Sequence, residues 1–229
     1  MAEAARPAFL GPPRRLELGD AALGAVTAVE LPAGVRAPAC DALAWRAGDP
    51  AAARLRLARD TPPGAYTAIV QRADGTRTPV TLQVQARARL RLRPGTLHVQ
   101  GAPGQRVAAS LVAENRGNVA VEIPEQAVGG VFADDGLETA FSAAYRLDSD
   151  DLDQVARTLF GKLRESHGGL LKLRVTAGAG ALAVGERRTL ALELELGRSL
   201  KGGRGYHGSV PLAGAAVGLR ITVIPGGKR

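Results

Sequence analysis

The sequence predicts an all-β protein made of two sandwich-type domains, the second interrupted by a helical insertion. Three observations support this prediction. Short apolar or alternating runs bounded by Gly, Pro, Asp and Asn recur along most of the 229 residues, as expected for strands and turns. One order of strands and turns occurs twice. A single stretch near residue 155 instead carries apolar residues at helical spacing.

Six strands are predicted in the first part of the chain, at residues 15–18, 25–31, 42–46, 53–58, 66–72 and 78–84. Asp74 and Gly75 lie between the last two strands. Asp-Gly is a strong hairpin signal because glycine adopts the positive φ that a tight turn requires. We therefore expect the last two strands to form a β-hairpin.

An arginine-rich segment follows at residues 86–93. Arginine alternates there with Ala or Leu, at Arg87, Arg89, Arg91 and Arg93. In a strand, the four guanidinium groups would share one face. That face suits an anionic partner such as a phosphate or an acidic protein surface. The alternative is a solvated strand face that protects a sheet edge. We place a domain junction in this segment and predict domains at residues 1–88 and 89–229.

The pattern of strands then restarts, at residues 96–99, 106–114 and 119–123, with a turn over Asn115, Arg116, Gly117 and Asn118. Four more strands are predicted near the end of the chain, at residues 170–175, 189–196, 207–212 and 217–224. These segments are short runs of alternating or continuous apolar character, as expected for strands.

Residues of about 126–168 are predicted to form the helical insertion. Its main helix has apolar residues at helical spacing, namely Leu152, Val155, Leu159, Phe160 and Leu163. Acidic residues at 148–151 can cap the start of this helix, and Gly168 with Gly169 is expected to end it. A shorter helix is predicted over residues 135–145. The main helix either packs against a partner subunit or merely covers an open end of the second sandwich.

Two stretches of the chain repeat one another. Residues 53–84 and 189–223 each contain a strand, a turn, a second strand that begins near Gly-Tyr, and a final strand. Tyr66 and Tyr206 occupy matching positions, which favours a structural role in which each hydroxyl bonds to nearby backbone.

With the Pro63–Thr67 segment, the Asp74–Gly75 turn and the turn at 115–118, the chain resembles bacterial immunoglobulin-like or fibronectin-like modules in tandem. This resemblance implies the fold only, because such sandwiches support many unrelated roles. The chain differs from antibody domains, since one Cys cannot form an internal disulfide.

No catalytic motif is visible, and one Cys with three scattered His gives no metal-ligand set. We therefore expect a protein that is not an enzyme and has no cofactor. No signal peptide and no run of about 20 apolar residues is visible, so a cytoplasmic protein without a transmembrane segment is expected. All but four of the 30 basic residues are Arg, and the net charge of +8 is attributed chiefly to compositional bias.

The predicted function is that of a structural or adaptor subunit that contacts other protein subunits in a homo- or hetero-oligomeric assembly. Two alternatives remain. One is a module that binds nucleic acid or another polyanion through the arginine segment. The other is a carbohydrate-binding or enzyme-accessory module, for which few of the eight aromatic residues can be spared from the core.

Overall fold

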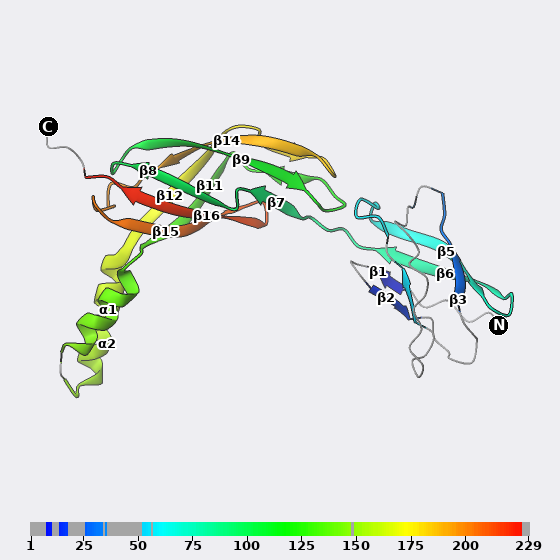
Figure 1. Cartoon of the computed structure of the whole chain (residues 1–229), viewed down its shortest axis with the longest axis horizontal. Helices are drawn as coiled ribbons and strands as arrows, with labels where there is room; N and C mark the ends of the chain where they lie inside the picture. Colours follow the sequence, from blue (N-terminus) through cyan, green and yellow to red (C-terminus); the bar gives the residue numbers. More distant parts are fainter. Residues whose placement is uncertain are drawn as a thin grey trace. The chain divides into compact units, whose positions relative to one another are not determined.

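The computed structural model describes residues 8–10, 14–17, 26–33, 35, 52–55, 57–147 and 149–225. The chain forms two compact units. The first comprises residues 1–89 together with 116–120, and the second comprises residues 90–115 together with 121–229. The described residues of both are chiefly in β-strands, and two helices belong to the second unit (Figure 1). The β-rich fold that the sequence predicts is confirmed.

The described residues of the first unit form two small sheets. One has the order β1-β6-β5-β3 and the other pairs β2 with β4. The strands are β1 (Ala8–Leu10), β2 (Arg14–Glu17), β3 (Val26–Glu30), β4 (Ala52–Leu55), β5 (Gly64–Arg72) and β6 (Arg77–Val84). The expected strand at 42–46, with Trp45, lies outside the described residues, as does Cys40.

The β5–β6 hairpin confirms the Asp-Gly turn signal. Gly75 has a φ of +83°, the left-handed conformation that glycine adopts most easily. The Asp74 carboxylate accepts a hydrogen bond from the Thr76 amide at 2.8 Å, and this bond lowers the pKa of Asp74. On the strands themselves, alternate residues such as Ala68, Val70 and Leu82 are buried.

The second unit is dominated by an eight-stranded sheet in the order β7-β9-β14-β12-β11-β15-β16-β8. Its members are β7 (Leu90–Arg93), β8 (Thr96–Gly101), β9 (Arg106–Asn115), β11 (Gln126–Ala133), β12 (His167–Ala177), β14 (Arg187–Glu195), β15 (Gly205–Leu212) and β16 (Ala215–Val223). The short strands β10 (Val121–Ile123) and β13 (Gly180–Leu182) pair separately. The two edge strands, β7 and β8, are consecutive in the chain.

Aliphatic side chains fill the core of the second unit. Strand residues that point inward alternate with exposed ones, and fully buried leucines include Leu171, Leu173, Leu190, Leu192 and Leu194. Tyr206 is buried among them, and its hydroxyl accepts a hydrogen bond from the Lys201 amide at 3.0 Å. The Tyr66 hydroxyl donates to the Pro62 carbonyl at 2.8 Å. The structural role predicted for both tyrosines is confirmed.

The same strand pairing occurs in both units. In the first unit β1 runs parallel to β6, followed by β5 and β3, and β2 pairs with β4. In the second, β8 runs parallel to β16, followed by β15 and β11, and β9 pairs with β14. These corresponding strands include both halves of the sequence repeat.

The predicted extent of the helical insertion is wrong at both ends. Residues 126–133 form β11, a strand in the middle of the sheet between β12 and β15. At the other end the helix stops at Ser166 and β12 begins at His167, so Gly168 and Gly169 lie in a strand. Glycines in these segments permit close contact between neighbouring strands. From the sequence alone, however, such glycines look like the boundary of a helix. A β-carbon at Gly129 of β11, for example, would lie 2.1 Å from the Ser209 carbonyl oxygen of the neighbouring strand β15.

Candidate functional site

The two helices form a hairpin that connects adjacent strands of the sheet. Helix α1 (Gly136–Tyr145) follows β11, and α2 (Leu152–Ser166) leads into β12, which pairs antiparallel with β11 (Figure 1). Gly136, at the start of α1, packs so closely on Ser166, at the end of α2, that an added β-carbon would lie 2.4 Å from the Ser166 β-carbon. The helices are therefore antiparallel and in contact along their length.

Polar contacts attach the base of the hairpin to the segment around β15. The Asp135 carboxylate accepts a hydrogen bond from the Arg204 guanidinium at 2.7 Å, which lowers the pKa of Asp135. Asp134 contacts Nδ1 of His207 at 2.8 Å. At the far end, the Asp151 side chain caps α2 by accepting from the amides of Asp153 and Gln154. The predicted acidic cap is confirmed.

The five apolar residues predicted on α2 divide into two groups. Val155, Leu159 and Leu163 are half-buried and follow a four-residue spacing, as expected for the side of α2 that contacts α1. Leu152 and Phe160 are instead 81% and 67% exposed. The single partner-binding face expected from the sequence is therefore mostly occupied by the hairpin's own contact.

Large apolar residues are also exposed on α1. Leu137, Phe141 and Tyr145, spaced by four residues, are 60%, 56% and 92% exposed. The buried residues of α1 include Ala140 and Ala144, so the exposed stripe lies about 100° around the helix from the contact with α2. Phe160 lies at a similar angle on α2. Because the helices are antiparallel, this angle brings Phe160 to the same side of the hairpin.

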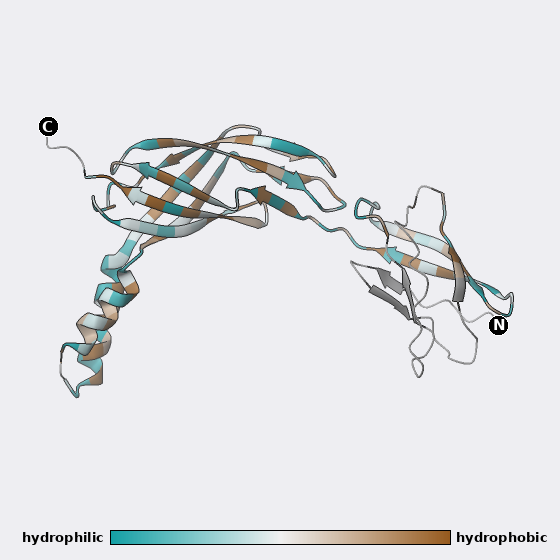
Figure 2. Cartoon of the chain, viewed as in Figure 1, coloured by the Kyte–Doolittle hydropathy of each residue, from teal (hydrophilic) through white to brown (hydrophobic). Residues whose placement is uncertain are grey.

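We call these four residues, Leu137, Phe141, Tyr145 and Phe160, the apolar flank. Figure 2 shows hydrophobic segments on the helical pair, away from the sheet. Monomeric proteins rarely leave large apolar residues clustered in water, and such clusters mark interaction sites. The sequence predicted both helices of the hairpin. It did not reveal which side of each helix is covered by the other.

The predicted four-arginine strand is wrong. Residues 85–89 are not in a strand, and only Arg91 and Arg93 lie on β7. Arg87 and Arg89 belong to the first unit, where their carbonyls accept hydrogen bonds from the amides of Asn118 and Arg116. Arg91 is half-buried opposite Glu114 of β9. Arg87 and Arg89 therefore do not share a strand with Arg91 and Arg93.

The three histidines of the chain are exposed on the sheet of the second unit. Strand registers place Phe132 opposite both His167 and His207, and Arg220 opposite both His207 and His98. Neighbouring histidines of this row are thus two strands apart, about 10 Å, too far to share a metal ion. Among the described residues, no group of His, Cys, Asp or Glu is arranged to hold a metal. The Asp134 contact with His207 was not visible from sequence spacing.

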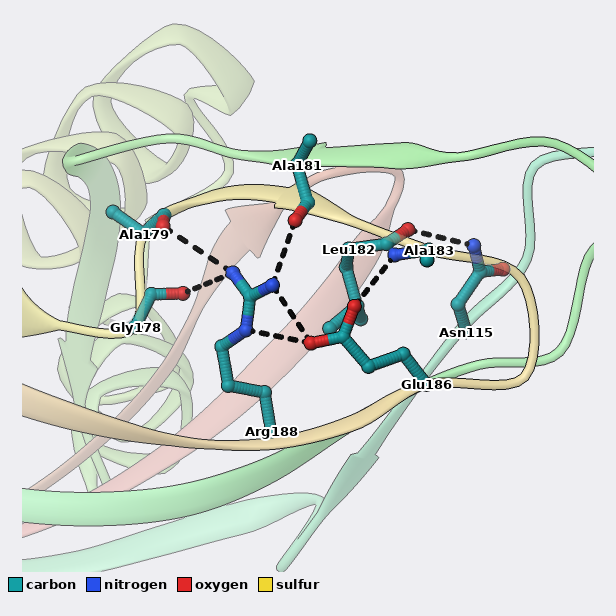
Figure 3. A network of polar contacts seen from close by, with 8 residues as sticks. All are labelled: Asn115, Gly178, Ala179, Ala181, Leu182, Ala183, Glu186 and Arg188. Carbon is teal, nitrogen blue, oxygen red and sulfur yellow. Dashed lines mark hydrogen bonds and ion pairs between the residues drawn. The ribbon is translucent and has the colours of Figure 1, made fainter.

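A polar network around Arg188 is structural (Figure 3). Its guanidinium donates to the carbonyls of Gly178, Ala179 and Ala181 and to the Glu186 carboxylate, at 2.7–3.3 Å. Glu186 also accepts from the Ala183 amide at 2.8 Å. These bonds hold the loop around β13 to the start of β14. The backbone bond from Ala183, assisted by Arg188, lowers the pKa of Glu186.

Replacing Glu186 with glutamine is expected to remove stability at neutral pH but little at low pH. A carboxyl group with a lowered pKa stabilises the folded state above its unfolded pKa and loses that effect as pH falls through the folded pKa. The difference in free energy of unfolding between wild type and Glu186→Gln should therefore shrink from about pH 7 to about pH 3. Denaturant titrations at both values measure it. A difference that does not change with pH would contradict the role of the charge.

Neither helix of the described residues has the length and apolar character needed to span a bilayer.

The chain resembles several solved structures. No family model and no curated protein matches the sequence. Solved structures that match include PapD-like domain 7 of human CEP192, with a TM-score of 0.28 and 11% identity over 60% of this chain and 86% of that one. Titin domains Z1Z2 in complex with telethonin match with a TM-score of 0.28 and 11% identity, over 97% of this chain and 93% of that one. Fibronectin(III)-like modules of Clostridium thermocellum CbhA match with a TM-score of 0.24 and 13% identity, over 97% of this chain and 90% of that one. These neighbours are immunoglobulin-like, PapD-like and fibronectin-like β-sandwich domains.

Proposed function

We propose that this protein is a non-enzymatic structural or adaptor subunit, composed of two immunoglobulin-like sandwiches in tandem, that binds another protein subunit through its helical hairpin. The shared strand order of the two units supports the tandem arrangement. The observation that carries the proposal is the apolar flank, whose four side chains are 56–92% exposed.

The position of the apolar flank supports an interface with a partner protein more than a role in covering the open end of the sandwich. A hairpin that covered the end of the sandwich would bury its apolar residues against the core. Here the only buried residue of α2 is Ser166, beside the sheet, and the exposed residues Phe141, Tyr145 and Phe160 lie further along the helices. Aromatic residues such as Phe141, Tyr145 and Phe160 supply large contact area at little cost in conformational entropy.

The proposal is tested by placing charges on the flank. In the full chain, Phe141→Asp combined with Phe160→Asp should release the tagged protein from its complex in extracts of cells that make it, as measured by sedimentation. Both positions are solvent-exposed, so circular dichroism and thermal unfolding should stay close to wild type.

Two control variants separate binding from folding. Leu170, on β12, is 68% exposed but lies outside the flank, so Leu170→Asp should leave the complex intact. Leu159 is half-buried between the helices, so Leu159→Asp should unfold the hairpin. The proposal fails if wild type and the flank variant sediment identically as free protein.

A further inference from the structure

The outer side of α2 contains a shallow hollow of about 470 Å³. Its six lining residues all come from this one helix, namely Asp153, Ala156, Arg157, Phe160, Gly161 and Arg164. It includes Phe160 of the apolar flank and is open to the surroundings of the hairpin. Around the helix, Asp153, Arg157, Phe160 and Arg164 lie at its centre, and the small residues Ala156 and Gly161 lie at its two edges.

The order of these residues along α2 is symmetric. When two copies of a helix pack antiparallel, a residue of one copy comes level with a residue of the other along the helix axes. The two residue numbers of every such pair add up to the same value. With the two-fold axis between positions 158 and 159, Asp153 lies opposite Arg164 of the other copy. Arg157 then lies opposite Phe160, while Ala156 and Gly161 of the other copy come level at the two edges of the contact. All six lining residues are paired by this one arrangement.

Each of these pairs is also chemically complementary. Asp153 and Arg164 have opposite charges, and within the described part of the chain neither forms an ion pair. Arg157 would place its guanidinium over the Phe160 ring, a favourable cation–π contact. Its Nε already bonds to the Asp153 carbonyl at 3.2 Å, which keeps the side chain along the helix. Ala156 and Gly161, at the two edges of the face, leave room for side chains of the other copy.

Gly161 provides an independent indication. Glycine inside a helix destabilises it by about 1 kcal/mol relative to alanine. The chain's own packing does not require glycine here, because a β-carbon at Gly161 would meet no atom within 4 Å. A helix that packs over this position from another molecule would provide a reason for the missing side chain.

We infer that the occupant of the hollow is a second copy of this chain, whose α2 packs antiparallel to the first across a two-fold axis. The inference rests on the proposed role of the hairpin as an interface and names the partner. A two-fold contact uses the same surface on both molecules, so that surface must be complementary to itself, as this hollow is. Phe141 and Tyr145 lie on the same side of the hairpin and extend the contact.

The purified full chain tests the inference by sedimentation equilibrium between about 1 and 100 µM. Wild type should form a dimer. Arg164→Asp places two like-charged pairs in the dimer and should raise its dissociation constant roughly tenfold or more. Asp153→Arg should do the same. The double variant Asp153→Arg/Arg164→Asp recreates both pairs in reverse and should restore the dimer.

Two further variants guard against indirect effects. Gly161→Leu fills the hollow while improving helix propensity, so it should abolish the dimer without unfolding α2, as circular dichroism would verify. Arg198→Asp makes the same change of charge on an exposed loop and should leave the dimer unchanged.

Two results would overturn the inference: a monomeric wild type at every concentration, or a dimer that Arg164→Asp and Gly161→Leu leave intact. If wild type is monomeric but its complex in extracts is lost on Phe141→Asp/Phe160→Asp, the hairpin is an interface for a different protein. The proposed function then stands and self-pairing does not.

Discussion

Replacing Gly129 with alanine is expected to destabilise the second unit by about 3 kcal/mol or more, whereas the same change at the adjacent Gly130 should be nearly neutral. At Gly129 a β-carbon would lie 2.1 Å from the Ser209 carbonyl oxygen and 2.8 Å from a Val210 methyl group. The oxygen belongs to the backbone of the neighbouring strand β15, so relief requires the β11–β15 pairing itself to shift.

Gly130 provides a matched control because it lies in the same strand. Its β-carbon would meet no atom closer than 3.8 Å, at His167 Nε2. Denaturant unfolding of both variants gives the comparison, with an unchanged m-value indicating that the same surface is exposed on unfolding. Equal stabilities of the two variants would show that β11 does not approach β15 as described. Since β11 leads into α1, the Gly129 variant should also disturb the hairpin.

Replacing Asn118 with alanine is expected to destabilise the first unit by about 3 kcal/mol. The Asn118 side chain is buried and bonds to three backbone groups. Its amide donates to the carbonyls of Thr61 at 3.0 Å and Gln85 at 2.9 Å, and its oxygen accepts from the Arg87 amide at 2.7 Å. Alanine leaves these polar groups without partners, which costs more than the bonds alone.

Hydrogen exchange at the amides of β5 and β6 measures this loss. Asn118→Asp keeps the size of the side chain and the acceptor for Arg87 but removes both donors, so it should also be destabilising. Gln105→Ala serves as the control, because this exposed side chain makes a single bond, from the Ala102 amide at 2.8 Å. Unchanged protection of β5 and β6 in Asn118→Ala would contradict the anchoring role of this residue.

Features that depend on neighbours in sequence were predicted well. The Asp74–Gly75 turn, the acidic cap of α2 and the alternating strands follow from backbone preferences and spacing within a few residues. The structural tyrosines were found because Tyr66 and Tyr206 recur at equivalent places in a repeat. Each of these signals is complete within a short segment.

Features that depend on distant neighbours were predicted poorly. Residues 126–133 form a central strand because β12 and β15 pair with them. This strand contains Gly129 and Gly130, so residue type alone did not predict it. Arg87 and Arg89 are not in a strand, and their carbonyls instead accept hydrogen bonds from the amides of Asn118 and Arg116. Neither partner is visible in the local sequence.

For the candidate site, the sequence determined that α2 exists, where it begins and which of its residues are apolar, because helical period and capping are local. Only the tertiary structure decided which of those residues face α1 and which remain in water. Val155, Leu159 and Leu163 lie on the side of α2 that α1 covers, while Phe160 and the stripe on α1 stay exposed. The physical reason is that one apolar pattern can satisfy several packing partners, and the chain's connectivity selects the partner that covers each side.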